Sequence, residues 1–70
     1  MSHDVWLYRN EYHTFRTVQR ETPEGAEVLL LGPQGQRVHE RFDTMDAAAA
    51  FREAVAARIM QCGYSLARRP

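Results

Sequence analysis

The residues of this chain that could do chemistry are few and widely spaced. Its three histidines are His3, His13 and His39, and its single cysteine is Cys62. Zinc sites need several cysteine or histidine ligands, often with two histidines four residues apart on one helix. The sequence contains no such set, so we expect no metal site and no cofactor.

Nucleophilic and acid–base chemistry have equally little support. Cys62 falls at the end of an apolar helical stripe, where we expect a buried and inert thiol. Glu21, Glu24 and Glu27 surround a turn and are expected to be solvated charges. The glycines at residues 32–35 precede a strand, whereas a phosphate-binding loop precedes a helix. The sequence therefore predicts a protein that is not an enzyme.

Basic side chains offer a candidate binding surface instead. All nine positively charged residues other than histidine are arginines, whose planar guanidinium groups bind phosphate or carboxylate in a bidentate manner. On two predicted strands basic residues recur at alternate positions, which places them on one face of each strand. Val38 and Phe42 take the intervening positions on the later strand and are better core residues, so we expect the basic row to face away from the core. The candidate binding residues are Arg16, Arg20, Arg37, His39 and Arg41.

These side chains must be positioned by short strands followed by one helix. Residues that favour β-structure, separated by turns rich in proline and glycine, predict the strands. The predicted strands span about residues 4–9, 12–20, 27–31 and 36–42. A helix is predicted at about residues 44–62, followed by a short tail at 64–70. Within this tail, residues 64–66 are a candidate for a short edge strand. Asp43 or Thr44 can cap the first free amides of this helix.

One apolar stripe of the helix is expected to face the sheet. At about 100° per residue, the stripe comprises Ala48, Phe51, Val55, Ile59 and Cys62. Ala49, Ala56 and Met60 are expected on the opposite side of the helix. The order of elements predicts one α+β domain spanning residues 1–70. It is a four-stranded antiparallel meander with the C-terminal helix packed on one face, a two-layer ββββα arrangement.

A single helix leaves the other face of the sheet open. Residues 28–31 are all aliphatic, so two of them must point to the open face in either register. For the first strand, either Trp6 and Tyr8 or Val5 and Leu7 face the helix. A two-residue turn at residues 10–11 would place the aromatic pair inside, and we favour it. A three- or four-residue loop is expected to leave that pair outside.

The last third of the chain resembles WGR-type domains. Phe42 ends a strand, the spacing from Ala47 to Phe51 is similar, and Gly63 and Tyr64 close the helix. The resemblance implies a strand-rich module closed by a helix, of a kind found in proteins linked to nucleic acids. The Trp-Gly-Arg tripeptide itself is absent, because Leu7 follows Trp6. The chain also resembles small bacterial proteins with four strands followed by a helix.

Bulk properties narrow the choice of partner. The formal net charge is zero, so no overall charge draws the chain to nucleic acid or to an anionic membrane. No apolar run approaches the length of about 18 residues that spans a bilayer. The first four residues lack the features of a signal peptide, and we expect a cytoplasmic protein.

The sequence therefore predicts a small non-enzymatic interaction module. Its open sheet face is expected to bind a protein partner or a second copy of the chain. Dimerisation is a common source of stability for domains of this size. The alternative is binding of single-stranded nucleic acid, since bases can stack on an exposed sheet while arginines hold phosphates.

Overall fold

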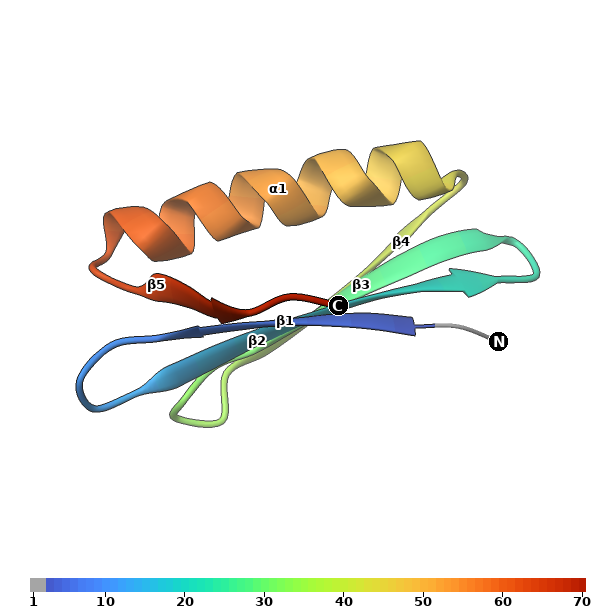
Figure 1. Ribbon diagram of the computed structural model, residues 1–70. Helices are drawn as coiled ribbons and strands as arrows, with labels where there is room; N and C mark the ends of the chain where they lie inside the picture. Colours follow the sequence, from blue (N-terminus) through green and yellow to red (C-terminus); the bar gives the residue numbers. More distant parts are fainter. Residues whose placement is uncertain (1–2) are drawn as a thin grey trace.

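A computed structural model describes residues 3–70 as a sheet with one helix on it (Figure 1). The elements are β1 (His3–Arg9), β2 (Thr14–Thr22), β3 (Gly25–Leu31), β4 (Arg37–Phe42), α1 (Met45–Gln61) and β5 (Ser65–Arg68). All strand pairs are antiparallel, and the order across the sheet is β4-β3-β2-β1-β5. The predicted α+β class with one helix is confirmed. The predicted count of four strands is wrong, because the described residues form five.

The additional strand, β5, comes from the segment predicted to be a tail. Gly63 adopts a positive φ of 92°, which glycine tolerates without steric cost. The chain then pairs with β1, placing Leu66 beside Tyr8 and Ser65 beside Arg9. This pairing uses the backbone groups of β1 that would otherwise form a free edge. Four residues are too few to show a clear alternation, which is why the sequence offered residues 64–66 only as a candidate edge strand and did not extend it to Arg68.

The helix begins where its capping signals predict. Thr44, one of the two predicted caps, accepts a hydrogen bond at 3.1 Å from the amide of Ala47. Asp46 in the first turn and Arg58 in the last turn both complement the helix dipole. These favourable ends suit a helix that otherwise depends on packing against the sheet.

Two predictions about helix faces are wrong. Ala56 is buried, with 6% of its surface exposed, and packs with Tyr8 and Ile59. A helix lying on a sheet buries more than a narrow stripe, so a residue flanking that stripe is also covered. Cys62 is exposed, because it is the C-cap and the helical spacing has ended there.

The first hairpin has a four-residue loop, so the predicted two-residue turn is wrong. Arg9 pairs with Thr14, and the Asn10 side chain accepts hydrogen bonds from the amides of Tyr12 and His13. Tyr8 consequently pairs with Phe15. The aromatic residues nevertheless face the helix, as favoured, because lengthening a loop by two residues preserves which side chains share a face. The expectation that a four-residue loop would leave them outside is wrong.

The core lies entirely between α1 and one face of the sheet. Its first cluster joins Tyr8, Ala56 and Ile59 to surrounding aromatic residues, and its second joins Ala26 and Val28 to the helix. At one edge of this layer Arg52 covers the Trp6 ring at 3.8 Å and donates a hydrogen bond at 2.9 Å to Gln19. Other members of the two clusters are Trp6, Phe15, Leu30, Phe42, Ala48, Phe51, Val55 and Tyr64.

The Thr17 hydroxyl is a weak point of this core. Thr17 is fully buried beneath the helix, and its oxygen has no hydrogen-bond partner within residues 3–70. We predict that Thr17→Val raises the free energy of unfolding by about 1 kcal/mol, because it removes a buried polar group that is not satisfied. Urea denaturation checks this, with Thr14→Val at the exposed start of β2 as the matched control. A lower unfolding free energy for Thr17→Val would contradict the prediction.

Candidate functional site

The face of the sheet opposite α1 is built from the alternate residues of all five strands. Cross-strand partners share a face, and those paired with the core residues are on the helix side. The open face therefore carries three rows of partners. They are Val5, Val18, Leu29 and His39; then Leu7, Arg16, Leu31 and Arg37; then His3, Arg20, Glu27 and Arg41.

The five residues predicted to form a binding surface lie on this one face. Arg16 and Arg20 come from β2, and Arg37, His39 and Arg41 come from β4. Between them on β3 lie Leu29 and Leu31, which pair with His39 and Arg37. The register thus brings the two predicted basic rows onto either side of a shared apolar strand.

The centre of the open face is aliphatic. We call the residues Val5, Leu7, Val18, Leu29 and Leu31 the aliphatic centre; all five are half-buried. They come from the three inner strands and lie on neighbouring positions across the sheet. The large aromatic residues Trp6, Tyr8 and Phe15 face the helix instead. The centre therefore provides apolar contact area without aromatic rings.

Arginine surrounds the aliphatic centre. The arginines of this face are Arg9, Arg16, Arg20, Arg37, Arg41 and Arg68. Within residues 3–70, Glu27 is the one acidic strand residue on the same face, since Asp4, Glu21 and Glu40 are on the helix side. The strand residues of this face, with six arginines and one glutamate, therefore carry a formal charge of +5. Because the chain has no net charge, the rest of the molecule carries −5.

Sequence reasoning missed Arg9 and Arg68. Arg9 alternates with Leu7 on β1, so its position was open to prediction once the register was known. Arg68 lies beyond the candidate edge strand at residues 64–66 and was expected to fray, whereas it is the last residue of β5. An irregularity in the β1–β5 ladder sets Arg68 opposite Leu7 and brings it to the open face. Such a bulge commonly redirects a side chain.

Glu27 is the buried anion of the open face. Only 5% of its surface is exposed, which corrects the expectation of a solvated turn residue. Its Oε2 lies 2.6 Å from His39 Nε2, and Arg20 Nε donates a hydrogen bond to its Oε1. The hydrogen bonds from His39 and Arg20 lower the pKa of Glu27, against the effect of its burial. Two of the five predicted binding residues are thus held by this carboxylate.

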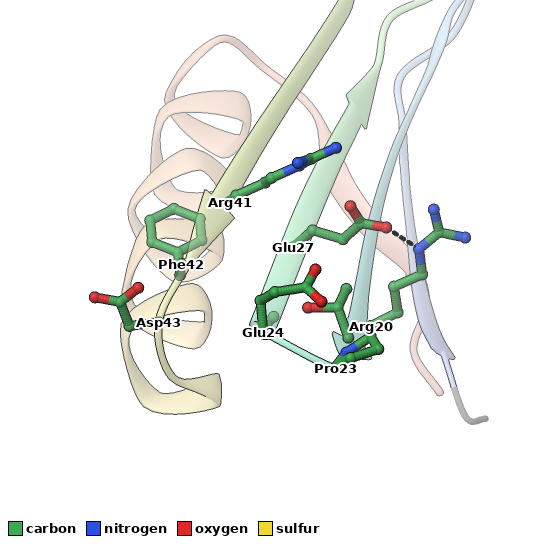
Figure 2. A pocket seen from close by; sticks show the side chains of 9 residues that line it. Arg20, Pro23, Glu24, Glu27, Arg41, Phe42 and Asp43 are labelled. Carbon is green, nitrogen blue, oxygen red and sulfur yellow. Dashed lines mark hydrogen bonds and ion pairs between the residues drawn. The ribbon is translucent and has the colours of Figure 1, made fainter.

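Two depressions lie at opposite parts of the open face. The first, of about 410 Å³, is shown in Figure 2, where Glu27 lies between Arg41 of β4 and Arg20 of β2. Glu24 and Asp43 also line it, so its charges are mixed. The second, of about 550 Å³, is lined by apolar and basic residues alone. They are His3, Val5, Leu7, Arg16, Arg68, Arg69 and Pro70.

The described residues offer neither a metal centre nor a membrane span. No group of three histidine, cysteine, aspartate or glutamate side chains within residues 3–70 is arranged to hold a metal ion. In the same part of the chain, no helix is both long enough and apolar enough to cross a bilayer. Arg16, Arg37, Arg41 and Arg68 form no ion pair with residues 3–70, so their charges are available to a ligand.

Comparison of the chain with protein-family models, with curated proteins and with solved structures found no match. The resemblance to WGR-type domains therefore stays a prediction.

The ion pairs of Glu27 predict a specific loss of stability in acid. A lowered folded-state pKa means that the contribution is complete above the unfolded value of about 4.5 and is lost as the pH falls through the folded value. We therefore predict that Glu27→Gln lowers the urea midpoint at pH 7. The same variant should lose less of its stability than the wild type as the pH falls below 4.5.

Urea denaturation between neutral and acidic pH measures both effects. Glu24→Gln in the exposed turn is the matched control, and it should follow the wild type throughout. Parallel acid profiles for the wild type and Glu27→Gln would show that these ion pairs contribute nothing.

Proposed function

We propose that this chain is a protein-interaction module whose open face binds an acidic region of a different protein. The observation that carries the proposal is the separation of charge. Six arginines and one glutamate surround an aliphatic centre in a chain whose net charge is zero. A face with this charge attracts anionic partners and excludes cationic ones.

The composition of the face supports a protein as that partner. Protein interfaces combine an apolar centre with a polar rim and are enriched in arginine. Here the half-buried side chains of the aliphatic centre form the apolar centre of the face. The polar rim is formed by Arg16, Arg37 and Arg68. Guanidinium groups form paired hydrogen bonds with carboxylates, so aspartate and glutamate side chains are suitable ligands.

Self-association through this face has less support than a different partner. Two copies placed face to face would oppose two surfaces of formal charge +5, at distances well within the Debye length of about 8 Å. Glu27 offers no compensation across the interface, because it is buried and already bound to Arg20 and His39. Repulsion of this kind favours a partner of opposite charge.

Binding of single-stranded nucleic acid is the second candidate function. The exposed arginines favour it, since they would hold phosphates and make the affinity salt-dependent. Base stacking has less support, because such surfaces use aromatic rings and Trp6, Tyr8 and Phe15 pack beneath α1. The aliphatic centre suits apolar side chains better than nucleobases.

The place of action that we propose is the cytoplasm. Cys62 is a free and exposed thiol, and free thiols persist in reducing compartments. The proposal therefore agrees with the compartment expected from the sequence.

We predict that an acidic peptide binds the open face through Arg16. The probe is a fluorescent peptide of glutamates and leucines in mixed order, titrated with protein in an anisotropy assay at physiological salt. Arg16→Glu should weaken its binding by about tenfold or more, because reversing a charge beside the aliphatic centre costs at least about 1.4 kcal/mol. Arg58→Glu on α1 is the matched control and should bind as the wild type does.

A mixed-sequence single-stranded DNA of equal charge serves as the competing ligand. Tighter binding of the DNA, with the same dependence on Arg16, would replace the proposal with the nucleic-acid function. Equal effects of Arg16→Glu and Arg58→Glu on the peptide would overturn the role of the open face.

A further inference from the structure

The edge of the sheet at β4 is open to another strand. β4 is the last strand on its side of the sheet order, and an edge strand presents backbone donors and acceptors that can pair with a further strand. Its ladder with β3 runs without irregularity from the Ala26–Phe42 pair to the Leu31–Arg37 pair. β4 also contains no proline. The opposite edge, β5, is only four residues long and carries the irregular pairing with β1.

The hairpin between β3 and β4 shows which backbone groups point outward. The Gly32 amide donates a hydrogen bond at 2.8 Å to the Gln36 carbonyl, which marks these residues as a hydrogen-bonded pair. In an antiparallel ladder such pairs alternate with pairs that are not hydrogen-bonded. Arg37, His39 and Arg41 therefore belong to the second kind. Their own amides and carbonyls point away from β3, toward the free edge.

The same three residues place basic side chains on the open face. A residue of an added strand opposite Arg37, His39 or Arg41 would share that face. Acidic residues opposite Arg37 and Arg41 would each face an arginine that forms no ion pair with residues 3–70. The residues Arg37, His39 and Arg41 of β4 thus offer outward-facing backbone groups for hydrogen bonds. The same segment carries the positive charge that would favour an acidic strand over others.

On the helix side of the β4 edge, the residues of an added strand that alternate with its acidic residues would be apolar. Val38 is 39% exposed on that side, next to Leu30. Leu30 lines an apolar groove of about 410 Å³ between the sheet and α1, together with Val55 and Ile59. An apolar side chain opposite Val38 would cover the exposed part of Val38.

We infer that the partner binds as an extended segment that adds a strand along β4, with acidic residues alternating with apolar ones. This inference rests on the proposed function and specifies the partner's form. Backbone hydrogen bonds supply affinity in such strand addition, and alternate side chains supply specificity.

A second copy of this chain does not meet these requirements. When two β4 strands pair with their open faces on the same side, basic residues oppose basic residues in every register, since that face of β4 carries Arg37, His39 and Arg41. Like charges directly opposite each other destabilise a strand pair. The occupant is therefore a different chain with an acidic edge.

Backbone methylation of a defined peptide tests the inference. The probe is a fluorescent nine-residue peptide that alternates glutamate with valine, and its binding is measured by anisotropy. Its glutamates would lie opposite the outward-facing residues of β4, so the glutamate amides would donate to β4 while the valine amides would point outward. Methylating the glutamate amides should weaken binding by about tenfold or more. Methylating the valine amides should change it by less than about twofold.

Two arginine variants locate the binding edge. Arg37→Glu on β4 should weaken binding by about tenfold or more, whereas Arg69→Glu, which follows β5 at the opposite edge, should have less than about a threefold effect. An amide NMR spectrum of each variant verifies that it folds. In the complex, the Arg37, His39 and Arg41 amides should exchange more slowly with solvent.

The possible failures separate the two proposals. If both methylated peptides bind as the unmodified one does, or if Arg69→Glu is as harmful as Arg37→Glu, strand addition at β4 is overturned. Binding of the mixed-order acidic peptide through Arg16, without binding of the alternating peptide, also overturns strand addition and leaves the proposed function intact. Failure of both peptides to bind would overturn both.

Discussion

The structure depends on one constraint, which is that a single helix can cover only one face of the sheet. α1 follows β4 at one edge and precedes β5 at the other, so the helix must cross the sheet as the chain passes between these edges (Figure 1). Because α1 covers one face of the sheet, the strand residues that point to that face form the core. Tyr8, Val28 and their neighbours are buried by it, and the other half of every strand is left to solvent or to a partner. The fold and the composition of the open face are consequences of the same choice of register.

That choice also separates charge. The residues that alternate with the core include six arginines, while most acidic residues lie on the helix side or in turns. Overall charge conceals this arrangement, which is why the neutral composition indicated no anionic partner. Glu27 sits within the basic face as a buried counter-ion, where it holds Arg20 and His39 in place. The unpaired arginines are left to act outward around the aliphatic centre.

The sequence pattern within each segment was sufficient to predict the helix, most of the helix stripe that faces the sheet, and the basic residues that share one face of β2 and of β4. Thr44, Phe51 and Arg41 could be placed because capping, the helical repeat and strand alternation are short-range properties. The extent of β5, from Ser65 to Arg68, could not be predicted beyond a candidate edge strand, since the strand forms only because β1 offers an edge. The loop after Arg9 depended on the Asn10 side chain binding two amides, a turn geometry that composition does not specify. Glu27 and Ala56 were misplaced because their burial depends on partners distant in the sequence.

The central claim is that one face of this protein is basic and free, and paramagnetic relaxation of the amide NMR signals tests it most directly. Two small nitroxides that differ only in the sign of their charge would be dissolved in turn with labelled protein. The account predicts that the anionic nitroxide broadens the amides around Val5, Val18 and Leu29 much more than those of α1. The cationic nitroxide should instead favour the turns and the start of α1. Equal broadening by both nitroxides would contradict the separation of charge, and protection of the open face from both would show that it is already covered by another copy.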